Sequence, residues 1–313
     1  MPFFSIIMPV YDREAYVERA LQSCLRQSFG DFEVIVVDDG SADRSTEVVE
    51  SVGDPRIRLL RHERNLGRCP ARNTGMAAAR GEWFVFLDSD DELLAGALQT
   101  IHAEACAAPP EVVALRYMCV DDRGTKSPEP AYRGERWSYE DYVRALDSDV
   151  RGEALPCSRT STFPGIAYPD GHAEEGLYHL DLARAGQVGT SPAVVRLYHQ
   201  DASNQITAPS VRRALRFARD AARNVDETLA RHGAALRRLA PATYAGRLRE
   251  GALTHFLAGH RRRGLQYARM ALAHGAGSAK LVLVVSLGLL GPLPLACSQA
   301  VQGLIRRRLV LPR

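Results

Sequence analysis

The 313-residue chain has almost no lysine, few aromatic residues and no closely spaced pair of cysteines. Lys126 and Lys280 are its only lysines, so its positive charge comes from arginine, much of it in the C-terminal third. The formal net charge of +3 is too small to indicate nucleic-acid binding by itself. The six scattered cysteines include no Cys-x-x-Cys pair, which argues against a disulfide framework or a zinc site and favours a reducing compartment.

Two kinds of membrane segment are also missing from the pattern. The apolar run 3–10 has no basic region before it and continues as a strand, so it does not resemble a secretory leader, and we expect a cytoplasmic protein. The apolar stretch 281–297 is broken by two glycines and two prolines, whereas a spanning helix needs about 20 uninterrupted apolar residues. Basic clusters at 261–263 and 306–308 flank it, which favours peripheral contact with the anionic inner face of a membrane. A helical hairpin packed on the rest of the protein is the alternative.

The overall composition, with 46% hydrophobic and 25% charged residues, is typical of a folded globular protein. Apolar runs alternate with helical patterns throughout the first hundred residues, which predicts an α/β domain with a mostly parallel mixed sheet. The predicted strands are 4–10, 32–37, 57–60, 83–87, 112–117 and 194–199. The predicted helices are 12–27, with Asp12 as its N-cap, and 43–51, 70–79, 139–146 and 176–185.

The composition changes beyond Ser210, where alanine, arginine and leucine recur at helical spacing. We therefore expect two regions: a nucleotide-binding α/β domain over 1–209 and an α-helical region over 210–313. The second region contains the interrupted apolar stretch and is the part expected to associate with membrane.

Acidic residues follow three of the predicted strands, of which the first ends in Pro9-Val10-Tyr11-Asp12. Asp38-Asp39-Gly40-Ser41 ends the second, and Asp88-Ser89-Asp90-Asp91 ends the fourth. The carboxyl ends of parallel strands meet at one edge of a sheet, where ligands bind. Carboxylates held a few Å apart repel one another, and a bound Mg²⁺ or Mn²⁺ relieves that repulsion. The alternative is that Asp88 caps a helix and the other acids are solvated; we expect Asp91 to cap the next helix.

Five segments together resemble a known family in their order and spacing. They are Pro9-Val10-Tyr11-Asp12, Asp38 to Ser45, Asn65-Leu66-Gly67, Ala71-Arg72-Asn73-Thr74-Gly75 and Phe86 to Asp91. Over about residues 4–200 the chain closely resembles the family 2 glycosyltransferases, although Asp12 stands where the family usually has Asn. The resemblance implies the GT-A fold and an enzyme that transfers a hexosyl or related group, with inversion, in a metal-dependent reaction.

The resemblance also assigns roles to individual residues. It implies that the nucleotide-sugar donor is bound by Pro9, Val10, Tyr11, Asp12, Asp39, Gly40, Arg72, Asn73, Asp88, Ser89 and His199. Within this set, Asp39 would accept a hydrogen bond from the nucleotide base, and Arg72 would lie near the diphosphate, since its planar guanidinium suits phosphate oxygens. The alternatives are a turn role for Asp39, a surface ion pair for Arg72 and a structural role for His199.

The same resemblance assigns the metal and the base. Asp90 is the expected ligand of Mg²⁺ or Mn²⁺, with Asp88 directed towards the ribose or a metal-bound water. The general base is expected in the pair Glu174-Glu175 at the start of a helix ending in Ala185-Gly186. Glu175 stands where the family has Asp, and Glu174 is the second candidate. The alternative is that both acids interact with the helix dipole.

The resulting hypothesis is an inverting glycosyltransferase of polysaccharide or glycoconjugate synthesis. It would transfer a sugar from a nucleoside-diphosphate sugar, with UDP as the expected nucleotide, to a glycan or lipid-linked acceptor. The alternative is a non-catalytic nucleotide-sugar-binding protein with a degenerate base position. Glu175 distinguishes the two, because the donor motifs would persist in either.

Overall fold

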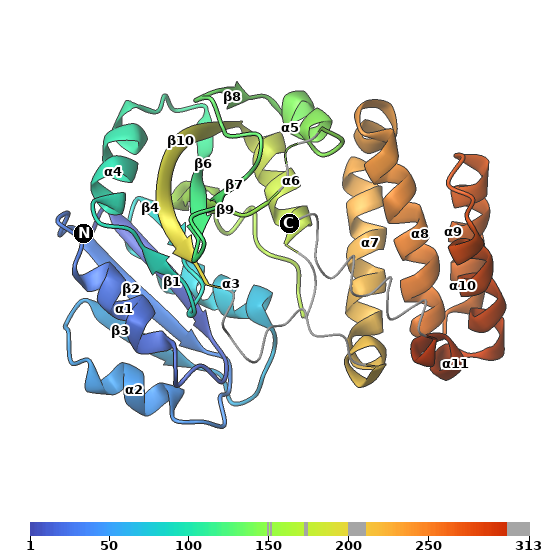
Figure 1. The fold of residues 1–313 in the computed structure, drawn as a ribbon, viewed down its shortest axis with the longest axis horizontal. Helices are drawn as coiled ribbons and strands as arrows, with labels where there is room; N and C mark the ends of the chain where they lie inside the picture. Colours follow the sequence, from blue (N-terminus) through green and yellow to red (C-terminus); the bar gives the residue numbers. More distant parts are fainter. Residues whose placement is uncertain (149, 151, 172–174, 200–210, 299–313) are drawn as a thin grey trace. The chain divides into compact units, whose positions relative to one another are not determined.

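The computed structural model describes residues 1–148, 150, 152–171, 175–199 and 211–298. Strands and helices alternate in the first part of the chain, and helices alone make up the second (Figure 1). The chain divides into two compact units, of which the first comprises Met1–Tyr142, Asp149–Gly171 and Tyr178–Asn204. The second comprises Val143–Ser148, His172–Leu177 and Gln205–Arg313.

The first unit is built on one mixed sheet with the strand order β3-β2-β1-β4-β9-β6-β10-β5, to which β7 and β8 add at β6 and β10. Its strands are β1 Phe4–Val10, β2 Phe32–Asp38, β3 Ile57–Arg61, β4 Trp83–Phe86, β5 Glu92–Leu93, β6 Val112–Asp121, β7 Lys126–Ser127, β8 Arg136–Trp137, β9 Ala154–Arg159 and β10 Gln187–Tyr198.

Strands β1 to β4 are parallel, with Phe4 opposite both Phe32 and Trp83. Strands β1, β2 and β4 are mostly apolar because helices cover both faces of the sheet there. Helices α1 (Val17–Leu25), α2 (Ser45–Ser51) and α4 (Ala97–Ala107) pack on the face that carries Phe4, Ile6 and Met8. On the other face, α3 (Arg68–Ala78) packs on Ile35 and Val37. The predicted α/β class with a mostly parallel mixed sheet is confirmed.

Two helix starts were predicted wrongly. Helix α1 begins at Val17 rather than at Asp12, which has a left-handed φ of 51° and does not cap it. Asp91 does not cap the next helix either, because the short strand β5 follows it and α4 begins only after Gly96. At the first place a loop occupies residues that the helical spacing had assigned to a helix, and at the second the strand β5 precedes the helix.

The middle of the chain completes the sheet. Strand β9 is antiparallel to both β4 and β6, and β10 runs parallel to β6 over a much longer span than the predicted 194–199. Helix α5 (Tyr139–Ala145), the 3₁₀ turn η1 (Thr160–Thr162) and helix α6 (Gly176–Ala185) connect these strands. In α6, Tyr178 hydrogen-bonds Ser158 of β9 at 2.9 Å and stacks on Tyr168 at a centroid distance of 3.9 Å.

The second unit consists mainly of the helices α7 (Val211–Leu239), α8 (Pro241–Leu257), α9 (Arg261–Ala273), α10 (Ala279–Leu290) and α11 (Pro292–Cys297). Phe256 of α8 is fully buried at its centre. Gly264 of α9 and Gly288 of α10 face this ring so closely that an added Cβ would lie within 3 Å of it. Among the described residues, no helix combines the length and the apolar character needed to cross a membrane.

Candidate active site

The carboxyl ends of five strands meet at one edge of the sheet. Strands β1, β2 and β4 are parallel, and β6 and β10 share their direction because β9 is antiparallel to both β4 and β6. This edge therefore gathers the segments that follow Val10, Asp38, Phe86, Asp121 and Tyr198. The convergence predicted from the sequence for the first three is confirmed.

At the end of β1, Pro9 is half-buried, Val10 is buried and Tyr11 is 43% exposed. Asp12 connects this end to the loop after β2, since its Oδ1 accepts a hydrogen bond from Ala42 N at 2.9 Å. The Asp12 backbone N–H donates in turn to Ser41 Oγ at 3.0 Å. These two bonds fix the β1 and β2 loops to each other beside the exposed Tyr11 ring.

Asp39 organises the loop that follows β3. Its Oδ1 accepts from Leu66 N at 3.0 Å and faces His62 Nδ1 at 2.7 Å, while Oδ2 accepts from Gly67 N at 2.8 Å. Each carboxylate oxygen has about two acceptor positions. Within the described residues Oδ2 has one partner, so it retains the capacity to accept one more hydrogen bond.

Gly40 makes the close contact between the β2 and β3 loops possible. Its φ of +75° lies in the left-handed region, and an added Cβ would be 2.7 Å from the backbone carbonyl carbon of Arg64. A glycine is required here both by conformation and by space.

Arg72 of α3 reaches the end of β4. Its Nη2 donates to Asp88 Oδ1 at 2.7 Å, and its guanidinium lies 5.4 Å from the centroid of the Tyr168 ring. The neighbouring Asn73 side chain holds the Tyr168 backbone through two hydrogen bonds of 2.9 Å. Arg72 is thus aimed at the acidic loop, whereas the Asn73 amide is directed at Tyr168.

Asp88 and Asp90 differ in their surroundings. The Asp88 side chain is 45% exposed, and that of Asp90 is 22% exposed with Arg13 Nε 3.6 Å from its Oδ2. Burial raises the pKa of the Asp90 carboxyl, and the nearby charge of Asp88 raises it further. Ser89 between them is buried. Arg19 anchors the loop, because its Nη2 donates to the Asp90 carbonyl oxygen at 2.8 Å.

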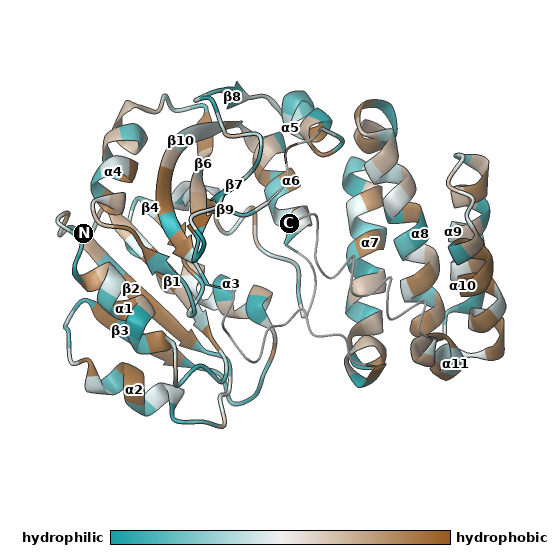
Figure 2. Cartoon of the chain, viewed as in Figure 1, coloured by the Kyte–Doolittle hydropathy of each residue, from teal (hydrophilic) through white to brown (hydrophobic). Residues whose placement is uncertain are grey.

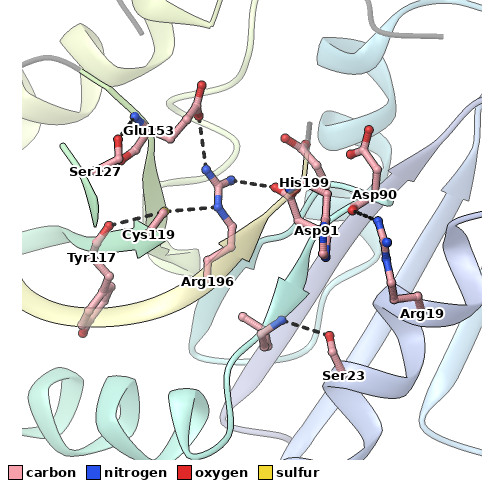
Figure 3. Close-up of polar contacts among 12 residues, drawn as sticks. Arg19, Ser23, Asp90, Asp91, Tyr117, Cys119, Ser127, Glu153, Arg196 and His199 are labelled. Carbon is pink, nitrogen blue, oxygen red and sulfur yellow. Dashed lines mark hydrogen bonds and ion pairs between the residues drawn. The ribbon is translucent and has the colours of Figure 1, made fainter. Parts of the chain in front are cut away.

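Asp91 is a buried ion-pair partner. Arg196 Nη1 of β10 lies 3.4 Å from its Oδ2, and the backbone N–H of His199 donates to its Oδ1 at 3.1 Å. Figure 3 shows the Arg196 guanidinium extending between Asp91 and Glu153, whose Oε2 is 3.2 Å from Nη2. Arg196 Nε also points to Cys119 Sγ at 3.2 Å. Burial raises the pKa of Asp91, and the Arg196 charge opposes that shift.

His199 lies between two more acids of the same edge. Its Nδ1 is 2.5 Å from Asp122 Oδ1 and its Nε2 is 2.8 Å from Glu92 Oε1, and its side chain is 9% exposed. His199 therefore lies in the acidic strand-end cluster and contacts side chains from the start of β5 and the end of β6. Its expected role in donor binding stays a prediction.

The carboxylate oxygens of Asp88 and Asp90 are chemically suited to bind a divalent cation. The pKa of Asp90 is raised by burial and by the charge of Asp88, and a bound cation would relieve the repulsion between the two carboxylates. Mg²⁺ is commonly held by one or two carboxylates, with phosphate oxygens and waters completing its shell. In the part of the chain that the structure describes, no cluster of three or more His, Cys, Asp or Glu side chains is arranged to hold a metal by itself.

Of the two glutamates predicted as the general base, only one lies within the described residues. Glu174 is not among them. Glu175 is half-buried and directly precedes α6, in the segment that belongs to the second unit. The role of Glu175 stays a prediction.

Three arginines that the motifs did not single out contact the acidic loop: Arg13, Arg19 and Arg196. Arg196 had a sequence signal, since a charged residue inside the apolar run Val194 to Tyr198 must find a buried partner. No local pattern distinguishes Arg13 and Arg19 from ordinary surface arginines, because their partners lie on a distant strand end.

Residues 5–158 match the family described as glycosyl transferase family 2. An uncharacterized glycosyltransferase of Haemophilus influenzae is 45% identical over 93 residues, which is 29% of this chain and 37% of that protein. A GalNAc(5)-diNAcBac-PP-undecaprenol beta-1,3-glucosyltransferase of Campylobacter jejuni is 41% identical over 108 residues, or 34% of this chain and 35% of its own. The matched regions therefore span about a third of the length of these curated relatives.

Solved structures show the same fold at low sequence identity. Staphylococcus aureus TarS 1–349 in complex with UDP-GlcNAc superposes with a TM-score of 0.62 at 18% identity, covering 98% of this chain and 91% of that one. The mannosyltransferase PcManGT of Pyrobaculum calidifontis, in complex with GDP-Man and Mn²⁺, gives a TM-score of 0.54 at 20% identity, covering 97% and 85%. The first unit thus has the GT-A fold, and residues 5–158 belong to glycosyl transferase family 2.

Proposed function

We propose that this protein is an inverting glycosyltransferase of polysaccharide or glycoconjugate synthesis that uses a nucleoside-diphosphate sugar, with UDP as the nucleotide. An acceptor hydroxyl oxygen forms a bond to the anomeric carbon while the bond from that carbon to the diphosphate oxygen breaks. The hydroxyl proton passes to a glutamate of the protein, and the nucleoside diphosphate leaves with the bonding electron pair.

The convergence of Asp39, Arg72 and the Asp88–Asp90 loop at one sheet edge carries this proposal. Asp39 Oδ2 retains an acceptor position suited to a base N–H, and the exposed Tyr11 ring offers a face for stacking. Arg72 and Arg13 supply positive charge beside the acidic loop, where a diphosphate would bind. The TarS complex with UDP-GlcNAc supports a UDP donor in this fold.

Asp90 and Asp88 are the residues that would hold Mg²⁺ or Mn²⁺. When bound, the cation neutralises diphosphate oxygens and so stabilises the leaving group. Arg72 already contacts Asp88 and Arg13 already contacts Asp90, so both arginines are placed to orient the two carboxylates. The Mn²⁺ in the Pyrobaculum mannosyltransferase complex supports metal use in this fold.

Glu175 is the proposed general base, with Glu174 as the second candidate. A carboxylate that accepts the acceptor's proton makes the hydroxyl a better nucleophile. We assign catalysis to residues 1–209 and acceptor or membrane contact to the helical region 210–313. The Campylobacter relative is named for a lipid-linked acceptor, which supports a lipid-linked or glycan acceptor here.

The test is release of nucleoside diphosphate from a panel of UDP-, GDP- and dTDP-sugars, with Mn²⁺ or EDTA and with candidate acceptors. We expect one donor to be turned over by the wild type only with metal, and Glu175→Ala to bind that donor without turnover. Donor binding without turnover by the wild type would favour the non-catalytic binding protein. Failure to bind any nucleotide sugar would contradict both functions.

A further inference from the structure

The last two described helices of the second unit, α10 and α11, expose large apolar side chains. Val282, Leu289, Leu290 and Leu293 are 63%, 46%, 71% and 60% exposed, and we call these four residues the α10–α11 face. Leu281, Val284 and Leu295 of the same two helices are buried in the core of the unit. Figure 2 shows α10 and α11 coloured mostly as hydrophobic.

The exposed side chains are not scattered. Val282 and Leu289 are seven residues apart and so lie on the same side of α10, and Leu290 and Leu293 are exposed on either side of the junction between α10 and α11. No charged residue occurs between Lys280 and Arg306. Clusters of this kind are uncommon on free protein surfaces and mark contact sites.

Charge is distributed very unevenly between the two parts of the chain. Residues 211–313 contain nineteen lysines and arginines but only four aspartates and glutamates, whereas residues 1–210 contain twenty-one against thirty-three. Helix α9, which packs against α8 and α10, exposes Arg261, Arg262 and Arg269. Arg263 is also exposed, with its side chain 45% accessible, but its Nη2 lies 3.2 Å from Asp226 Oδ1.

We propose that the α10–α11 face docks the protein onto an anionic lipid bilayer. The aliphatic side chains enter the boundary between headgroups and acyl chains, and the exposed arginines of α9 attract the lipid phosphates. A lipid surface offers acyl chains and anionic phosphates, and the second unit has exposed apolar side chains for the first and positive charge for the second. The inference does not depend on the enzymatic activity, although docking would bring the protein to a lipid-linked acceptor.

The test is co-sedimentation of the full-length protein with phosphatidylcholine vesicles that either contain or lack phosphatidylglycerol. We expect binding that requires the anionic lipid and weakens at high salt. The variant Leu289→Gln/Leu290→Gln/Leu293→Gln should bind about tenfold more weakly or worse, because it removes the inserted apolar area. Arg262→Gln/Arg269→Gln should lower only the part of the binding that depends on phosphatidylglycerol.

The matched control is Ala230→Gln/Ala234→Gln, which adds glutamines at two exposed positions of α7 and should bind like the wild type. Thermal unfolding of each variant verifies that the fold is kept. Unchanged vesicle binding by the triple leucine variant would overturn the proposal, as would equal binding to both vesicle types. If the wild type ignores vesicles and forms a dimer that the triple variant dissociates, the face belongs to a second copy of the chain and the proposal is wrong.

Discussion

Arg196 Nη1 lies 3.4 Å from Asp91 Oδ2, and the two side chains are only 4% and 8% exposed. The pair joins strand β10 to the loop that carries Asp88 and Asp90. Because His199 also donates its backbone N–H to Asp91, the end of β10 holds the acidic loop at two points. The proposed metal-binding residues thus depend on an ion pair that neither of them makes.

We expect Arg196→Met to lower the free energy of unfolding by about 3–5 kcal/mol, because it leaves the Asp91 carboxyl buried without its cation. Urea unfolding followed by circular dichroism measures the loss. The double variant Arg196→Met/Asp91→Asn should recover a large part of it, since no buried charge is left unpaired and Glu153, the second partner of Arg196, is 55% exposed. If the double variant is as unstable as the sum of the two single variants, the ion pair is not the origin of the loss.

Asp90→Asn should abolish metal-dependent turnover while leaving the fold intact, because its side chain is partly exposed and an amide is a weaker cation ligand. The readout is nucleoside diphosphate release at increasing Mn²⁺. Asp54→Asn is the matched control, since Asp54 pairs with Arg56 in the turn before β3 and should not affect turnover. An Asp90→Asn protein with wild-type turnover and metal response would remove Asp90 from the proposed site.

Gly40→Ala should destabilise the protein more than Gly124→Ala. Both glycines have a positive φ, and a left-handed conformation costs an L-residue about 1–2 kcal/mol. Only at Gly40 would the new Cβ also meet backbone, that of Arg64 and Asn65, within 3 Å. Comparison of the urea midpoints of the two variants separates the steric cost at Gly40 from the cost of the left-handed conformation. Equal losses of stability would show that the β2 and β3 loops can move apart without cost.

The carboxyl of Glu33 predicts a pH dependence of stability. Burial alone raises its pKa, but hydrogen bonds from Arg58, Ser5 and the Arg80 backbone N–H hold that pKa below the usual 4.5. A depressed pKa in the folded state contributes stability that is present above the unfolded pKa and is lost as pH falls through the folded one.

Between pH 7 and pH 3 the wild type should therefore lose more unfolding free energy than Glu33→Gln, which has no carboxyl to protonate. Parallel slopes for the two proteins below pH 5 would show that Glu33 does not contribute to acid lability.

The sequence predicted those parts of the fold that depend on local pattern. The apolar runs of β1, β2 and β4 and the spacing of α3 and α6 were sufficient, because helices cover both faces of the sheet and most strand positions are therefore apolar. The pairing of β9 between β4 and β6 could not be read in this way. Its residues Ala154–Arg159 contain a proline and have no clear period, and their place is set by partners far away in the sequence.

The same limit applies to the site. Asp88 and Asp90 were identifiable because a buried strand and an acidic cluster adjoin in the sequence. Asp91 was assigned to a helix cap because its true partner, Arg196, is contributed by another strand. Asp39 was expected to face a ligand, but three of its contacts hold the loop after β3, a role that only the folded chain reveals.

The most direct measurement is calorimetric titration of UDP and GDP into the wild-type protein, with Mn²⁺ and after EDTA treatment. We predict saturable binding of at least one of the two nucleotides, and weaker binding after the metal is removed. Binding should be about tenfold or more weaker in Arg72→Gln, because this variant loses a guanidinium at the acidic loop. Absence of binding by either nucleotide with the metal present, or binding that neither EDTA nor Arg72→Gln affects, would contradict a metal-assisted nucleotide site at this edge of the sheet.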